Sequence, residues 1–294
     1  MTLIKKILVT IKSLYLTVYY LMRLVFFSPK LEPGNNGYVV SLTSYGSRVK
    51  FSFLTIESIF QQSFKPDAIV LWLYKNDKPR GVWLKILQHQ ERRGLTVRYV
   101  DRDVRSYKKL SFILDDNSLP RHITPKFIVT ADDDIFYPEN WMEGFNNYNK
   151  KNEPAVLCYR GRNIIINKNG RISPYDQWSL ASKMSAKDYT ILPTGVSGIC
   201  YPIKALDNSI ALFDEIAKIC PYADDIWYKM VTTKNNFDSR LIVKDSIHFV
   251  PVFTGFTKGL EKFNVINKLN DNQFIASMDY FMLNVSSFMI NKDK

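Results

Sequence analysis

The chain has 294 residues, enough to bury a substantial core as one large α/β domain or as a domain with appendages. Its apolar fraction of 46% is ordinary for a globular protein, which excludes wholesale disorder. The net charge of +12 predicts an acidic partner, such as nucleic acid, an anionic membrane or a phosphorylated substrate. The cysteines Cys158, Cys200 and Cys220 are widely spaced, which argues against a disulfide framework or a zinc ribbon.

The first thirty residues are basic and apolar and contain no acidic side chain. Lys12 and Arg23 interrupt the apolar run that a transmembrane helix needs, and no small-residue cleavage site marks a secretory signal. At about 100° per residue, Lys5, Lys12 and Arg23 share one bearing, and apolar residues lie opposite. These apolar residues are Ile4, Ile7, Ile11, Val18, Met22 and Val25.

This pattern favours a helix that lies in the plane of a membrane, with its basic side chains on anionic headgroups. The alternatives are a tilted single span and a helix packed on the domain. The predicted location is peripheral, on the cytoplasmic face of the inner or plasma membrane.

After a turn-rich linker at 31–37, strand-like and helical segments alternate. Strands are expected at 38–42, 68–73, 95–100 and 127–129, and helices at 51–62, 83–93 and 106–114. This alternation predicts a three-layer α/β domain with a largely parallel sheet and right-handed crossovers. The segment 43–48 follows the first strand's carboxyl end, where open α/β sheets bind ligands, although an ordinary turn would look the same. The phosphate-binding GxGxxG and GxxxxGK[ST] loops are absent, which argues against a dinucleotide or P-loop enzyme.

Three adjacent carboxylates, Asp132, Asp133 and Asp134, follow the fourth predicted strand. Because adjacent carboxylates repel one another, a fold places them at a strand end with a counter-charge. A hard divalent cation with oxygen ligands is one such counter-charge. The alternative is an acidic surface loop.

The second half of the chain is less regular. A helix is expected at 141–149, followed by strand-rich sequence from 155 to 172 with a hairpin turn at 167–170. The strand-like run 192–202 contains Gly195 and Gly198, which indicate either a bulge or a close backbone approach to a ligand.

A helix is expected at 205–219, and a second one opens at Asp224 and Asp225, where capping and the macrodipole favour carboxylates. Strands are expected at 241–243 and 247–250. His248 lies in the second of these, and a histidine in such a strand is usually a core residue. Apolar residues at helical spacing in the tail, 274–289, suit packing on the domain or on the membrane.

The order of these motifs resembles the nucleotide-sugar glycosyltransferases of the GT-A fold, of the kind that build bacterial surface polysaccharide or lipopolysaccharide. An Asp-x-Asp after a strand, a glycine-containing strand, an acid at a helix start and a late histidine follow one another. The opening VVSLTSYGSR and the strand AIVLWL are also similar. The resemblance implies a Rossmann-like GT-A domain at 38–260. The helix at 1–30, the linker at 31–37 and an expected helical tail at 261–294 lie outside it.

The resemblance also implies roles for individual residues. Asp134 would bind Mn²⁺ or Mg²⁺ that bridges the diphosphate, and His248 would be a further metal ligand. Asp132 would contact the ribose or the metal shell, and Asp133 could take part of either role. Asp225, with Asp224 as the alternative, would be the catalytic base, and Gly195 and Gly198 would lie under the donor or acceptor. The nucleotide-sugar contacts would be Thr43, Ser44, Tyr45, Arg48, Asp77, Lys108, Lys109, Asp132 and Asp133. For Lys108 and Lys109, a solvated helix face is the competing interpretation.

The implied reaction moves a sugar from a nucleoside-diphosphate sugar to a hydroxyl of a glycan or lipid-linked acceptor. A cation stabilises the leaving diphosphate and a carboxylate takes the acceptor's proton, so the displacement inverts the anomeric centre. The expected partners are the donor, the acceptor and an anionic membrane surface, without nucleic acid. One alternative is another metal-dependent nucleotidyl or phosphoryl transferase. Another is a basic nucleic-acid-binding protein, for which no zinc-finger, helix-turn-helix or RNA-recognition signature is present.

Overall fold

The computed structural model describes residues 3–115, 118–183, 188–253 and 269–289. The chain forms two compact units, which are described separately. The first comprises Met1–Lys150 and His248–Thr257, and the second comprises Lys151–Ile247 and Lys258–Lys294.

The first unit alternates strands and helices, as the sequence predicts. Its described helices are α1 (Leu3–Phe26), α2 (Ser52–Phe60), α3 (Val82–Arg92), α4 (Lys108–Ser111) and α5 (Trp141–Asn149). Its described strands are β1 (Tyr38–Thr43), β2 (Ala68–Tyr74), β3 (Leu95–Val100), β4 (Phe127–Ala131), β5 (Ile135–Phe136) and β11 (Val250–Pro251).

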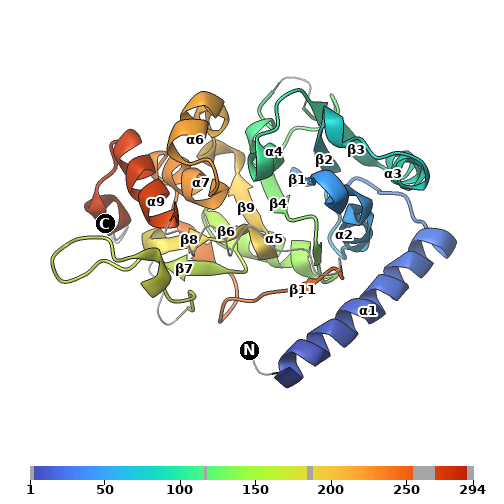
Figure 1. Cartoon of the computed structure of the whole chain (residues 1–294), viewed down its shortest axis with the longest axis horizontal. Coiled ribbons are helices and arrows are strands. Elements are labelled where there is room, and N and C mark those ends of the chain that lie inside the picture. The colour runs from blue at the N-terminus through green and yellow to red at the C-terminus, as the bar shows by residue number, and fades with distance from the viewer. Residues whose placement is uncertain (1–2, 116–117, 184–187, 254–268, 290–294) are drawn as a thin grey trace. The chain divides into compact units, whose positions relative to one another are not determined.

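Four of these strands form a parallel array in the order β4-β1-β2-β3. Helices α2 and α3 lie on one face of the array and α4 on the other, as Figure 1 shows and as right-handed crossovers in this strand order require. The central strands consist mostly of apolar residues and are buried on both faces, as is usual for parallel strands. The predicted mixed α/β architecture with mostly parallel strands is therefore confirmed.

The second unit is built from shorter elements. Its described helices are α6 (Phe213–Ile219), α7 (Asp224–Lys234) and α9 (Leu269–Tyr280). Its described strands are β6 (Val156–Cys158), β7 (Gly161–Asn163), β8 (Ile191–Pro193), β9 (Ile199–Pro202) and β10 (Ser239–Leu241). Strand β6 pairs with β10 in parallel and with β9 in antiparallel, and β7 pairs with β8. The hairpin turn expected at 167–170 is present, because Ile166 bridges Ile172 across it.

Several element predictions need correction. The helix expected at 205–219 begins only at Phe213, because Asp207 accepts a hydrogen bond from the Ser209 backbone nitrogen and caps a short 3₁₀ turn instead. The helix expected at 106–114 is a 3₁₀ turn followed by the four-residue α4. The strand expected at 192–202 is two strands, β8 and β9, separated by a 3₁₀ turn that ends at Gly198 with a φ of 86°. Such a φ interrupts a strand.

The connections around α3 show why a glycine is needed at its end. Gly94 follows α3 with a φ of 114°, which L side chains rarely adopt. A Cβ at Gly94 would lie 2.8 Å from the Cβ of Leu31, so the linker after α1 passes directly over this turn. The backbone nitrogen of Leu31 also donates to the carbonyl of Arg93, at 2.7 Å.

Candidate functional site

The first unit brings polar side chains together at one end of its sheet. The chain leaves β1 toward β2 and β3 on one side, whereas β4 lies on the other side of β1. Strand order therefore reverses between β1 and β4, and open α/β sheets bind ligands just beyond such a reversal. Leu42 pairs with Ala131 at this edge, so Ser44 and the acidic trio both follow it directly.

The central carboxylate of the trio connects the two strand ends. Asp133 is buried, and its two carboxylate oxygens accept hydrogen bonds from the Ser44 hydroxyl and the Arg48 guanidinium. Its carbonyl oxygen accepts from the Thr55 hydroxyl of α2 at 2.9 Å. Burial raises the pKa of Asp133, and Arg48 and Ser44 oppose that rise. With both oxygens engaged, Asp133 is placed to hold Arg48 in position rather than to face a ligand.

The two outer carboxylates are more accessible. Side-chain exposure is 30% for Asp132 and 33% for Asp134. Lys109 Nζ lies 3.1 Å from Asp132 Oδ1, and Arg48 Nη2 lies 2.7 Å from Asp134 Oδ2. Among the ion pairs of the described residues, these three carboxylates share two cations, Arg48 and Lys109.

Burial makes Asp134 a weaker acid than a free aspartate. Its pKa is raised to about 6, because burial disfavours the charged form. Arg48 opposes the shift, while Asp132 and Asp133 add to it. A further cation at this edge would relieve the repulsion.

A complete metal site made only of protein groups is not formed in the part of the chain that the structure describes. No three His, Cys, Asp or Glu side chains converge there as ligands. His248 is exposed, precedes β11 rather than lying inside a strand, and its Nδ1 is 2.8 Å from the carbonyl oxygen of Phe249. Asp132 and Asp134 instead offer partly exposed oxygens of the kind that hold Mg²⁺ together with phosphate oxygens.

The remaining sequence-predicted contacts divide into two groups. Arg48 lies against the Tyr45 ring, 5.3 Å from its centroid, and the nearby Asp77 accepts from the Gly46 backbone nitrogen at 3.1 Å. These contacts hold the loop that carries Arg48. Thr43 and Lys108 form the second group, because their side chains contact residues outside this loop.

The Thr43 hydroxyl donates to the Trp72 carbonyl of β2 at 2.8 Å. Lys108 is fully buried and pairs with Asp103, whereas its neighbour Lys109 faces Asp132. Neither lysine is on a solvated helix face, because α4 buries both.

Tyr137 is a residue at this site that sequence reasoning did not identify. Its buried hydroxyl accepts a hydrogen bond from the Asp132 backbone nitrogen at 2.9 Å. Burial, reinforced by the charge of Asp132, raises the pKa of Tyr137 well above its usual value, so it stays a neutral phenol. A tyrosine five residues after an aspartate carries no periodic signal in the sequence, and only the turn between β4 and β5 brings the two together.

In the second unit, the structure brings together the glycine turn and the acid at the helix start. The Gly195 backbone nitrogen donates to Asp225 Oδ2 at 2.9 Å. Asp225 lies in the first turn of α7 beside the buried Asp224. Lys229, one turn further on, is buried, and its Nζ lies 3.1 Å from the Ser239 hydroxyl. The nearby Cys158 is a buried thiol whose pKa burial raises to about 12, so it is a core residue.

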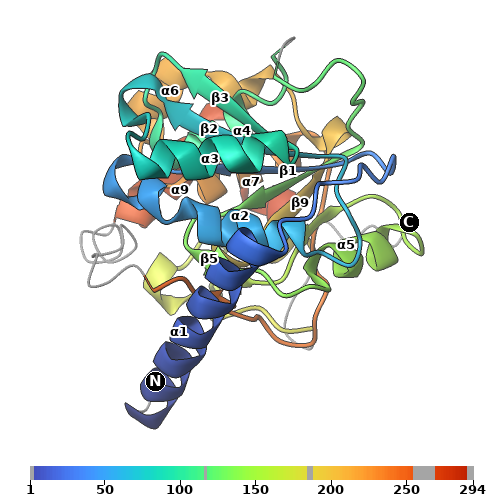
Figure 2. The same cartoon turned by 90° about the vertical axis from the view of Figure 1, so that its right-hand side faces the viewer.

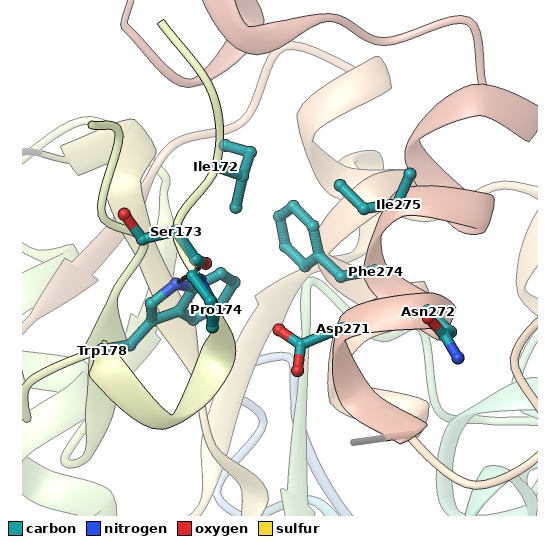
Figure 3. Close-up of a pocket in the computed structure, with 8 residues that line it drawn as sticks. All are labelled: Ile172, Ser173, Pro174, Trp178, Asp271, Asn272, Phe274 and Ile275. Carbon is teal, nitrogen blue, oxygen red and sulfur yellow. Dashed lines mark hydrogen bonds between the residues drawn. The ribbon is translucent and has the colours of Figure 1, made fainter. Parts of the chain in front are cut away.

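The second unit also contains a small pocket of about 310 Å³ beside the start of α9. Figure 3 shows Trp178 and Phe274 near Asp271 at its wall. Asp271 Oδ1 accepts from the Tyr175 backbone nitrogen at 2.6 Å, so this carboxylate fastens the loop to the helix. None of the sequence-predicted site residues lines this pocket.

Comparison with known proteins places the chain near glycosyltransferases. It is 25% identical to an uncharacterised glycosyltransferase of Rickettsia prowazekii over 170 residues, which are 51% of this chain and 53% of that protein. A similar protein of Rickettsia typhi is 25% identical over 169 residues, 51% of this chain and 52% of the relative. The chain thus spans about half the length of the curated relatives it matches. No protein-family model matches it.

Solved structures of low sequence identity also match this chain. The first 349 residues of Staphylococcus aureus TarS match with a TM-score of 0.46 and 15% identity, over 82% of this chain and 73% of that one. A mannosyltransferase from Pyrobaculum calidifontis, in complex with GDP-Man and Mn²⁺, matches with a TM-score of 0.46 and 10% identity. That match covers 96% of this chain and 82% of the other. The relatives' names confirm the resemblance to glycosyltransferases that the motifs predict.

Proposed function

We propose that this protein is a glycosyltransferase that uses a nucleoside-diphosphate sugar and a divalent cation. The observation that carries the proposal is the polar cluster beyond β1 and β4. Arg48 and Lys109 are held there beside two partly exposed carboxylates, at the strand reversal where ligands bind. The names of the curated relatives support the same class of reaction.

The chemistry of a leaving diphosphate explains the mixture of charges. Arg48 and Lys109 stabilise the negative charge that develops on the nucleoside diphosphate as the sugar leaves. Asp132 and Asp134 would hold Mn²⁺ or Mg²⁺, which would supply further positive charge. Asp133 and Ser44 keep Arg48 in place during this step, and Tyr137 fixes the backbone of Asp132.

For the acceptor, we propose that Asp225 takes the proton from the attacking hydroxyl. The backbone nitrogen of Gly195 donates a hydrogen bond to the Asp225 carboxylate and so holds this side chain in one orientation. Attack assisted by a single base displaces the diphosphate directly and inverts the anomeric centre. The acceptor is a glycan or a lipid-linked glycan of a surface polysaccharide or lipopolysaccharide.

The test separates donor binding from turnover. The purified protein is incubated with a panel of nucleotide sugars and Mn²⁺ or Mg²⁺, and donor hydrolysis or transfer is measured by mass. Asp134→Asn should weaken metal-dependent donor binding. Asp225→Asn should preserve donor binding and lower turnover by about 10²- to 10⁴-fold, the usual contribution of a general base.

The exposed Asp279 in α9 provides a matched control, because Asp279→Asn removes the same charge from a surface position. Retention of full activity by Asp225→Asn would refute its assignment as the base. Transfer of a phosphoryl or nucleotidyl group, rather than the sugar, would show the alternative enzyme class. The anomeric configuration of the product, followed by NMR, tests inversion.

A further inference from the structure

Helix α1 packs on the first unit along one narrow stripe. Ser13, Tyr20 and Leu24 are buried on this stripe, and Leu16 packs beside them. The Ser13 hydroxyl donates to the Pro251 carbonyl at 2.7 Å. Figure 2 shows that the N-terminal part of α1 extends away from the rest of the unit, and residues 4–8 are exposed to solvent.

The stripe belongs to a hydrophobic cluster and not to a loose surface contact. Tyr20 and Leu24 share this cluster with Phe53 and Leu54 of α2, Phe136 of β5 and Val252. The Tyr20 ring stacks on Phe136, with centroids 5.3 Å apart and planes at 15°. Removing α1 from this position would expose the apolar side chains of the cluster to water, which is unfavourable.

The opposite side of α1 is apolar and exposed to solvent. Its residues are between 50% and 71% exposed, and they are Ile4, Ile7, Ile11, Val18, Met22 and Val25. Soluble monomers rarely leave so continuous an apolar face uncovered, so the face marks a contact with another surface.

The charges beside the apolar face identify that surface. Lys5, Lys12 and Arg23 fall on one flank of the helix, between the packed stripe and the exposed face. No acidic residue occurs anywhere in α1. An apolar face bordered by cations alone matches anionic headgroups above acyl chains.

We infer that α1 lies in the plane of an anionic lipid surface while it stays packed on the first unit. By length and composition α1 is also able to cross a membrane, since residues Ile4–Phe26 have a mean hydropathy of 1.3. A span would have to surround the helix with lipid, which requires Tyr20 and Leu24 to leave their cluster. The packed stripe therefore favours the in-plane arrangement, and this inference does not depend on the proposed enzymatic activity.

This arrangement fixes the orientation of the polar cluster beyond β1 and β4 relative to the membrane. Phe136, which stacks on Tyr20, is two residues after Asp134, and the Val252 nitrogen donates to the Asp134 carbonyl at 2.6 Å. Because α1 packs directly on these segments, the lipid surface holds the first unit in one orientation instead of tethering it through a flexible linker.

The experiment measures binding of the full chain to vesicles. Sedimentation is compared for phosphatidylcholine vesicles with and without phosphatidylglycerol, at low and high salt. We expect binding to anionic vesicles that weakens with salt. Val18→Asp should reduce it by about tenfold or more, because it places a carboxylate in the apolar face. Lys5→Glu with Lys12→Glu should lower binding to anionic vesicles by a similar factor, at about 1 kcal/mol for each lysine near the surface.

Val82→Asp is the matched control, because Val82 is 59% exposed on α3 and Val18 is 60% exposed on α1. It should bind vesicles like the unaltered protein, and thermal unfolding should show that all variants remain folded. Equal binding by Val18→Asp and Val82→Asp, or no binding to anionic vesicles, would overturn the inference. So would resistance to alkaline carbonate extraction, which indicates a span. A dimer that Val18→Asp dissociates, without vesicle binding, would show that the face joins two copies of the chain.

Discussion

At the residue scale, the three adjacent aspartates have different environments. Asp133 is enclosed by Ser44 and Arg48, while Asp132 and Asp134 keep about a third of their side chains exposed. The sequence cannot separate them, because DDD is symmetric in composition. The separation arises because the chain turns between β4 and β5, which directs the middle carboxylate inward and the outer two toward the strand ends.

Asp134 makes the stability of the metal-free protein depend on pH. Its pKa is 3.8 as an unperturbed group and about 6 in the fold, so the folded state binds the proton more tightly. The free energy of unfolding should therefore fall as pH rises through this window and level off above it. Asp134→Asn should remove a fall of about 1 to 2 kcal/mol, a value reduced for the partial exposure of the side chain.

Urea denaturation of both proteins in EDTA, from about pH 4 to pH 7.5, measures this difference. The pH profile of the unaltered protein should approach that of Asp134→Asn at low pH and lie below it at neutral pH. Profiles that stay parallel across the whole range would contradict the raised pKa.

At the element scale, one buried ion pair joins α2, α3 and the segment after α1. Glu57 of α2 is fully buried and accepts hydrogen bonds from Arg93, at 2.6 and 3.0 Å, and from Gln90 at 2.7 Å. Arg93 Nε also donates to the Pro29 carbonyl at 2.9 Å, and its guanidinium lies over the Phe60 ring. The pair thus locks two helices and the linker in one arrangement.

Arg93→Ala should destabilise the protein by about 3 to 5 kcal/mol, because it leaves the Glu57 carboxylate buried without its counter-charge. The adjacent Arg92 is exposed, so Arg92→Ala should change stability by less than about 0.5 kcal/mol. Chemical denaturation of the two variants gives the comparison. A small and equal effect for both would show that Glu57 finds another partner or takes up a proton.

At the scale of the whole molecule, α1 is part of the fold and also has a solvent-exposed apolar face. Its buried stripe completes the hydrophobic cluster of the first unit, while its other side stays exposed. The helix is therefore an integral part of the first unit. The residues of its packed face and those of its exposed face are subject to different physical constraints.

Deleting residues 1–28 should therefore lower the melting temperature and increase binding of a hydrophobic dye, since Phe53, Leu54, Phe136 and Val252 lose their cover. Tyr20→Ala, in the full chain, should cost about 3 to 5 kcal/mol by removing the stack on Phe136. Val18→Asp should leave the melting temperature unchanged. A truncated protein as stable as the full chain would mean that the packed stripe contributes little.

The sequence predicted an element correctly where the spacing of its apolar residues and the residues at its ends indicated the same helix or strand. The strands β1, β2 and β3 and the helices α3 and α5 lie within about two residues of their expected bounds. Predictions failed where side chains competed with the backbone, as at Asp207, or where a glycine adopted a positive φ, as at Gly198. In such places a few hydrogen bonds outweigh propensity over many residues.

The sequence by itself determined the alternating α/β pattern, the position of the acidic trio after a strand, and the basic and apolar sides of α1. These properties depend on residue type and spacing, which are local. Only the tertiary structure decided that Asp133 faces Arg48 and Ser44, that Lys109 rather than Lys108 faces Asp132, and that Tyr20 packs on Phe136. Each of these contacts joins residues from different elements, so its existence depends on the order of the strands and the packing of the helices, which spacing along the chain does not encode.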